Sequence, residues 1–168
     1  MYLLDEIQRL FDHGGPVLTA ILVISTIMWT LIIERYLYLY LVHPVKIKTY
    51  VDFWSKRTDH SSWIARKQRE GVIGDISLNL KKNLTVIQTL VAVLPLLGLL
   101  GTVTGMISTF DVMMKFGTGN ARGMAAGISE ALITTAAGLV TSLSGLYFSS
   151  QLQARAETEM HRITDLLI

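Results

Sequence analysis

The chain contains no cysteine and few charged residues. Of its 168 residues, 17% are Asp, Glu, Lys or Arg, whereas 51% are hydrophobic. The absence of cysteine excludes disulfides, thiolate chemistry and cysteine-based zinc sites. The low charge content excludes an intrinsically disordered protein, which needs low hydrophobicity and high net charge. An average soluble domain carries about 25% charged residues, so this chain is too apolar for that class.

The few charges leave three long uncharged runs, which cover residues 14–33, 83–110 and 131–154. A membrane-spanning helix needs about 20 mostly apolar residues to cross about 30 Å of hydrocarbon. Three such runs in so short a chain leave too little polar sequence to cover a soluble core. The runs therefore predict an all-α, polytopic membrane protein with three transmembrane helices, in contact with the lipid bilayer.

Lysine and arginine are unevenly distributed between the segments that flank these runs. Of the 15 in the chain, ten lie in residues 35–82 and two in the C-terminal tail. Cytoplasmic segments of membrane proteins are enriched in these residues. The pattern predicts an N-terminus outside the cell membrane and a C-terminus in the cytoplasm. Acidic residues are interspersed in the basic segment, so topology explains its charge better than binding to nucleic acid.

The predicted segments follow from these boundaries. They are a short periplasmic N-terminal segment (1–13), a first transmembrane helix (14–41), a basic cytoplasmic helical connection (42–82), a second transmembrane helix (83–110), a periplasmic turn (111–122), a third transmembrane helix (123–150) and a cytoplasmic helical tail (151–168). Apolar residues at helical spacing predict that the second and third helices continue into the cytoplasm. Gly71, Gly74 and Asp75 predict a turn within the connection.

Small and hydroxyl-bearing residues follow one face of the second predicted helix, at spacings of three and four. They are Gly98, Thr102, Gly105 and Thr109, and Gly101 with Gly105 forms a G-x-x-x-G motif. In lipid, small residues allow helices to approach closely. The face is either a packing surface or the lining of a polar passage, and this helix alone favours packing. Pro95 removes one helical hydrogen bond and predicts a kink.

The third predicted helix carries an acidic residue well inside its span. Glu130 shares one face with small residues and hydroxyls: Gly127, Thr134, Gly138, Thr141 and Gly145. A carboxylate in hydrocarbon is costly, so it faces water or a partner and marks a functional site by default. The alternative is a glutamate that stays hydrated near the outer interface, paired with Arg122 or Lys115. Gly127 and Gly138 are predicted packing positions, as are Gly98, Gly101 and Gly105.

One acid with a set of hydroxyls is typical of a proton pathway, because hydroxyl groups both donate and accept hydrogen bonds and can order water. The four histidines lie outside the predicted spans, and the sequence has neither a phosphate-binding glycine loop nor a cluster of metal ligands. No histidine stands beside a membrane serine or threonine to activate it. The sequence therefore predicts a protein that is not an enzyme and binds no cofactor or metal.

Two stretches resemble the core motifs of the ExbB/TolQ/MotA proton-channel family. They are residues 95–105, PLLGLLGTVTG, and residues 127–138, GISEALITTAAG, and the likeness is greatest to compact ExbB proteins. The resemblance implies a homopentameric ring in the bacterial inner membrane. It also implies ExbD-like partner helices, with a membrane-embedded aspartate, inside that ring. A TonB-like protein would then use the proton-motive force to drive outer-membrane transport of nutrients such as iron-siderophores.

The resemblance places the pathway residues of the family at Thr102, Glu130 and Thr135. Five residues turn an ideal helix by about 140°, so Glu130 and Thr135 do not both point into one lumen. In the favoured arrangement, Thr102 and Thr135 line the pore and Glu130 lies at its edge, near a helix seam. In the alternative, Glu130 faces the lumen together with Thr134 and Thr141.

Three functions are compatible with this sequence. The first is a subunit that powers TonB, and the second is a TolQ- or MotA-like stator subunit that drives a different load. The third is a structural membrane scaffold whose small-residue faces only pack. Oxygen ligands suit hard cations, so sodium is as compatible with these residues as a proton.

Overall fold

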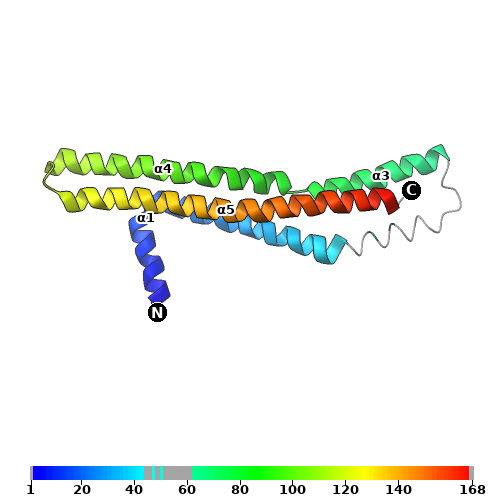
Figure 1. Cartoon of the computed structure of the whole chain (residues 1–168), viewed down its shortest axis with the longest axis horizontal. Helices are drawn as coiled ribbons and strands as arrows, with labels where there is room; N and C mark the ends of the chain where they lie inside the picture. Colours follow the sequence, from blue (N-terminus) through cyan, green and yellow to red (C-terminus); the bar gives the residue numbers. More distant parts are fainter. Residues whose placement is uncertain (1, 44–46, 48–49, 51–61, 167–168) are drawn as a thin grey trace. The chain divides into compact units, whose positions relative to one another are not determined.

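The computed structural model describes residues 2–43, 47, 50 and 62–166, and every regular element among them is helical. The elements are α1 (Tyr2–Leu37), a π-helical turn η1 (Tyr38–Val42), α3 (Trp63–Lys81), α4 (Leu84–Phe116) and α5 (Ala121–Leu166) (Figure 1). Three helical stretches are long and apolar enough to cross a membrane: Gly15–Val42, Arg66–Phe116 and Ala121–Thr164. The prediction of an all-α fold with three spans is confirmed.

The loop between α4 and α5 is shorter than the turn predicted for residues 111–122. Helix α4 continues to Phe116, and α5 begins at Ala121. Gly117 ends α4 in a left-handed conformation, with φ of 73°, and its N–H donates to Met113 O at 2.9 Å. Asn120 caps α5, because its Oδ1 accepts from the N–H of Gly123 at 3.1 Å. These caps set the helix ends, so the charged residues Asp111 and Lys115 remain helical.

The turn predicted at Gly71, Gly74 and Asp75 is wrong, because all three residues lie inside α3. The helical structure is interrupted instead at Lys82 and Asn83, which form a turn between α3 and α4. Asn83 has φ of 62°, and asparagine tolerates this left-handed region better than most residues. Helices α3 and α4 are therefore two helices, separated by Lys82 and Asn83. Of the predicted connection, residues 44–46, 48–49 and 51–61 lie outside the described residues.

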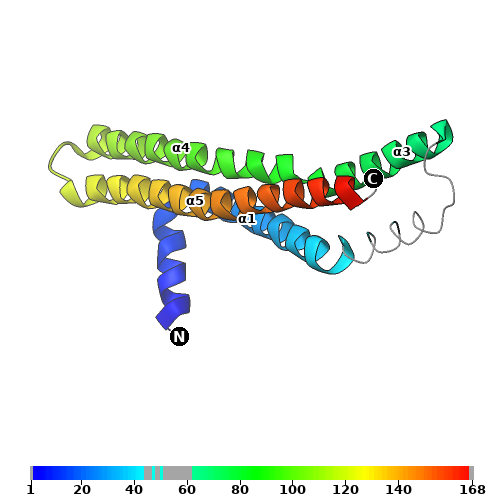
Figure 2. The ribbon, with the colours of Figure 1, turned by 45° about the vertical axis from the view of Figure 1, so that its right-hand side comes forward.

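The chain divides into two compact units. The first contains Met1–Trp29 and Gln88–Leu146, and the second contains Thr30–Ile87 and Tyr147–Ile168. In the first unit, α4 and α5 run antiparallel side by side, joined by the short loop at Gly117 (Figure 2). Its core includes the fully buried side chains of Met28 and Leu94. Helices α4 and α5 therefore form an antiparallel hairpin.

In the second unit, the buried side chain of Arg35 holds the end of α3. Its Nη2 donates to Asn79 O at 2.9 Å, and its Nε donates to Lys82 O. Beside it, Asn83 Nδ2 donates to Glu34 Oε2 at 3.3 Å. The last carbonyls of a helix lack partners within the helix, and a cation there also complements the helix dipole. The Glu34–Arg35 pair of α1 therefore secures the break between α3 and α4.

We expect Arg35→Met to destabilise the protein by about 2 kcal/mol, because it leaves two part-buried carbonyls without their charged donor. The measurement is the thermal unfolding of the detergent-solubilised protein. Lys81→Met is the matched control, because Lys81 is exposed and lies next to the same break. Equal losses in the two variants would show that Arg35 does not cap α3.

Candidate functional site

Glycines bring the backbones of α4 and α5 into direct contact. A Cβ added to Gly105 would lie 2.7 Å from both Gly127 O and Ala131 Cβ, and one added to Gly138 would lie 2.7 Å from Leu94 O. Such distances are too short for any larger residue without a shift of the backbone. The glycines predicted as packing positions all lie along this contact: Gly98, Gly101, Gly105, Gly127 and Gly138.

Hydroxyl groups satisfy backbone carbonyls across the same contact. Thr135 Oγ1 donates to Gly98 O of α4 at 2.9 Å and lies 3.0 Å from Ala131 O of its own helix. Further along, Ser142 Oγ donates to Val91 O at 2.9 Å. Interhelical hydrogen bonds of this kind contribute about 0.6 kcal/mol each in a membrane protein. Thr135 therefore has a packing role in addition to any role in a pathway.

Thr134 is enclosed within the α4–α5 contact. Its side chain is 1% exposed, and a Cβ at Gly101 would lie 2.5 Å from Thr134 Cβ. Its hydroxyl is 3.0 Å from the carbonyl oxygens of both Glu130 and Ala131. The small-residue face thus buries Thr134 against the neighbouring helix of the same chain.

Thr102 and Thr141 are half-buried, and each hydroxyl bonds within its own helix. Thr102 Oγ1 donates to Leu99 O at 2.6 Å, and Thr141 Oγ1 donates to Ala137 O at 2.8 Å. A hydroxyl oxygen that donates in this way can still accept. Exposed apolar side chains surround Thr102 on α4, including Leu99 and Val103. This face of α4 is available to a further helix. Pro95 lies inside α4, which is continuous on both sides of it.

Glu130 is half-buried on α5, with its carboxylate against the backbone of α1. A Cβ added to Gly15 would overlap Glu130 Oε1 and lie 3.0 Å from its Cδ. The ion pairs among the described residues are Lys67–Glu70 and Arg162–Glu159. Glu130 is therefore paired with neither Arg122 nor Lys115, which the sequence left open as partners.

Gly15 was missed by reasoning from the sequence. Its φ of 62° and ψ of −171° interrupt α1 immediately before Pro16. The signal was present as the Gly-Gly-Pro stretch that begins the first uncharged run. Nothing in the local sequence indicates, however, that Gly15 contacts a carboxylate on α5.

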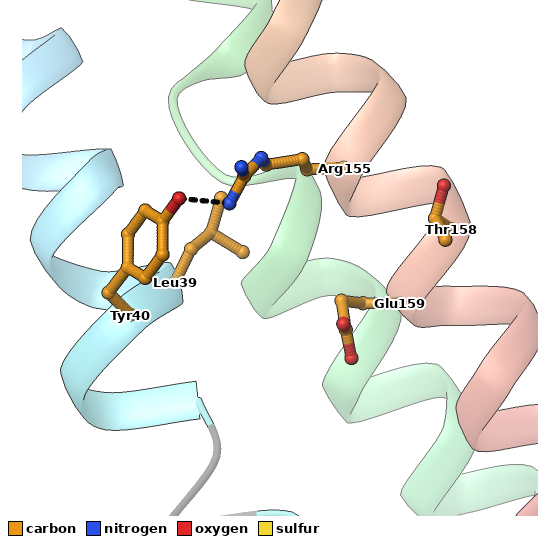
Figure 3. A pocket seen from close by; sticks show the side chains of 5 residues that line it. All are labelled: Leu39, Tyr40, Arg155, Thr158 and Glu159. Atoms are coloured by element: carbon orange, nitrogen blue, oxygen red, sulfur yellow. Dashed lines mark hydrogen bonds between the residues drawn. The ribbon is translucent and has the colours of Figure 1, made fainter.

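The second unit contains a cavity of about 340 Å³, shown in Figure 3. It is lined by Leu39, Tyr40, Arg155, Thr158 and Glu159. Arg155 reaches from α5 to η1, where it donates to the hydroxyl of Tyr40 and lies 4.9 Å from the centre of its ring. This combination of a hydrogen bond and a cation–π contact ties the C-terminal part of α5 to the end of the first helix.

Residues 42–165 match the MotA/TolQ/ExbB proton channel family, and the chain belongs to that family. The matched region includes both helices of the glycine contact and the whole of the Thr102, Glu130 and Thr135 set. This is a family of proton channels rather than of enzymes. With three helices able to span a bilayer, the chain is a multi-pass membrane protein.

Curated relatives carry ExbB names. The chain is 30% identical to the biopolymer transport protein ExbB of Aquifex aeolicus over 84% of this chain and 78% of the relative. It is 34% identical to ExbB of Helicobacter pylori over 51% of this chain and 59% of the relative. It is 45% identical to a putative ExbB-like protein of Synechocystis over 42% of this chain, and the match spans 35% of that relative's length.

We expect Gly101→Ala to destabilise the protein by about 2 kcal/mol, because the added methyl group overlaps Thr134 in a packed contact. The double variant Gly101→Ala/Thr134→Ala removes the overlapping atoms and should recover part of the loss. Thermal unfolding in detergent measures both effects. Gly119→Ala is the control, since nothing lies within 4 Å of its added Cβ. A double variant less stable than Gly101→Ala would contradict the proposed contact.

The buried side chain of His43, at the end of η1, makes the stability of the protein depend on pH. Burial lowers the pKa of His43 below 6.5, although the charge of Glu159 acts in the opposite direction. Unfolding restores the ordinary pKa, so below 6.5 the unfolded chain binds a proton that the folded chain does not. This stabilisation is complete above 6.5 and is lost as the pH falls through the lower folded pKa.

The melting temperature should therefore fall between about pH 7.5 and about pH 5.5, and it should fall less in His43→Gln. His161→Gln is the control, because His161 is exposed on α5. If all three proteins respond equally to pH, the effect does not come from His43.

Proposed function

We propose that this chain is the ring-forming subunit of a proton-driven complex in the bacterial inner membrane. By its resemblance to ExbB, it forms a homopentamer around ExbD-like helices that carry a membrane-embedded aspartate. Proton passage moves those helices, and a TonB-like protein transmits the work to outer-membrane transporters. The ExbB names of the curated relatives support this load over the TolQ- or MotA-like alternative.

The observation that carries the proposal is the carboxylate of Glu130 inside a spanning helix without a cation beside it. The described residues give Glu130 no ion pair, and it is only half-buried within one chain. An intramembrane acid is costly unless water, a partner or protonation relieves the charge. A helix of a partner subunit, or water between subunits, would supply that relief. Such a group can accept a proton and release it.

The placement of the threonines supports the arrangement with Thr102 and Thr135 lining the path. Thr102 is half-buried on α4 next to the exposed side chains of Leu99 and Val103, and Thr135 is half-buried and bonds across the α4–α5 contact. Thr134 is enclosed within the chain, so it is a poor candidate for the lumen. Glu130 then lies at the edge of the path, near the seam with α1.

The topology proposed from the charge distribution is a periplasmic N-terminus and a cytoplasmic C-terminus. It places the α4–α5 loop in the periplasm, and α3, the basic connection and the end of α5 in the cytoplasm. Arg35 and Tyr40 then lie near the cytoplasmic surface, where amphipathic aromatic and cationic side chains are favoured.

A structural scaffold without an ion path is the second candidate function. The glycine contact between α4 and α5 favours it, because that contact accounts for most of the small-residue pattern without any ion. It does not account for Glu130 or for the hydroxyl of Thr102. Those two residues therefore discriminate between the two functions.

We expect Glu130→Gln to reduce proton flux through the reconstituted complex about 100-fold, because the amide cannot carry the proton. Thr102→Val should reduce flux about fivefold, which corresponds to the loss of one hydrogen bond of about 1 kcal/mol. The measurement is the pH change inside vesicles that contain the chain and an ExbD-like protein, with a sodium gradient as a separate arm.

Thr26→Val is the matched control, because the Thr26 hydroxyl also donates to its own helix, at Leu22 O, in the first span. It should conduct within about twofold of the unmodified protein. The native mass of each complex verifies that the ring and its partner remain assembled. Unchanged flux in both Glu130→Gln and Thr102→Val would overturn the assignment and leave the scaffold function standing.

A further inference from the structure

The break in α1 is encoded by the residues at its centre. Gly15 has φ of 62° and ψ of −171°, a conformation that is essentially restricted to glycine. Pro16 follows it, and the residue before a proline is disfavoured in the helical region. Proline itself suits the first position of a helix, where its missing N–H is not needed. The chain therefore leaves one helix at Gly15 and begins the spanning helix at Pro16.

A second constraint acts on Gly15 from another helix. The carboxylate of Glu130 occupies the space that a side chain at position 15 would need. A Cβ at Gly15 would overlap Glu130 Oε1, and it would lie 3.0 Å from Cδ and 3.7 Å from Cγ. Glycine is thus required at position 15 both by the backbone conformation and by the carboxylate. The two requirements are independent, because the first would hold without α5.

The backbone of Glu130 is held separately from its carboxylate. Its neighbour Ala131 is 4% exposed and lies against α4, where a Cβ at Gly105 would be 2.9 Å from Ala131 N. The α4–α5 contact therefore sets the position of the α5 backbone at this level. That contact does not set the direction of the Glu130 side chain. The carboxylate lies in the space that a side chain at position 15 would occupy.

We infer that Gly15 is a positioning residue for Glu130, because the space left by its missing side chain holds the carboxylate against α1. The first helix of the same chain then forms one wall of the proton-carrying site. The inference rests on the proposed function only in so far as Glu130 carries protons. The placement of the carboxylate stands on the contact itself.

The test compares Gly15→Ala with Gly117→Ala in the complex reconstituted with its ExbD-like partner. Gly117 also has a left-handed φ, of 73°, but nothing lies within 4 Å of its added Cβ. It therefore reports the effect of an alanine at a positive φ where the added side chain meets no other residue. We expect Gly15→Ala to reduce proton flux about tenfold or more and Gly117→Ala to leave it within about twofold.

A double variant distinguishes the contact with the Glu130 carboxylate from a general requirement for the helix break at Gly15. Glu130→Asp withdraws the carboxylate by one methylene and makes room for the methyl group at position 15. The double variant Gly15→Ala/Glu130→Asp should conduct at least about fivefold better than Gly15→Ala, or should assemble where Gly15→Ala does not. A double variant no better than Gly15→Ala in flux and in assembly would assign the effect to the backbone and overturn the inference.

A measurement independent of flux uses a hydrophobic carbodiimide, which modifies carboxyl groups within the membrane. The modified Glu130 peptide is quantified by mass spectrometry, with Glu130→Gln as the blank. We expect Gly15→Ala to change the labelling rate of Glu130 severalfold and Gly117→Ala to leave it unchanged. A changed labelling rate in a protein that conducts no protons would sustain the positioning role and reject the proposed function. An unchanged rate in Gly15→Ala would overturn the positioning role, whatever the flux.

Discussion

The close approach of α4 and α5 is the constraint on which the first unit depends. In lipid, water does not drive apolar side chains together, so helices associate through dispersion contacts and hydrogen bonds at short range. The glycines allow the two backbones to come this close, and the hydroxyls of Thr135 and Ser142 then donate to carbonyls on the opposite helix. Because the backbones nearly touch, the rotation of each helix is set. That rotation decides which side chains are enclosed and which are left for other subunits.

Polar contacts of α1 and η1 form a second constraint, with one set of contacts in each unit. In the first unit, the break at Gly15 accepts the carboxylate of Glu130. In the second unit, Arg35 caps the end of α3 and Arg155 binds Tyr40. Buried or stacked arginines of this kind combine charge, hydrogen bonds and apolar contact in one side chain. Polar groups therefore fix the first helix at positions where apolar packing alone would allow it to rotate or slide.

These arrangements separate two roles that the sequence presents together. Small and hydroxyl-bearing residues on α4 and α5 follow one pattern, yet Thr134 is enclosed while Thr102 is only half-buried. The chain belongs to a family of proton channels, and the enclosed residues fix the packing of α4 against α5. The proposed pathway residues lie on the border of that contact, where a partner helix can approach.

The sequence by itself determined the helical class, the three spans and the family. Long uncharged runs have few alternatives in a membrane, and the two glycine- and threonine-rich motifs are specific. The C-terminus of α4 and the N-terminus of α5 were also encoded locally, in Gly117 and Asn120. The predicted turn was nevertheless longer than the observed loop, because its boundary was set by the nearby charged residues. The break at Asn83 was encoded in the same way, by one residue in a left-handed conformation. Only the tertiary structure decided that Thr134 is buried and that Gly15 meets Glu130, because both depend on helix rotations that contacts between distant segments set.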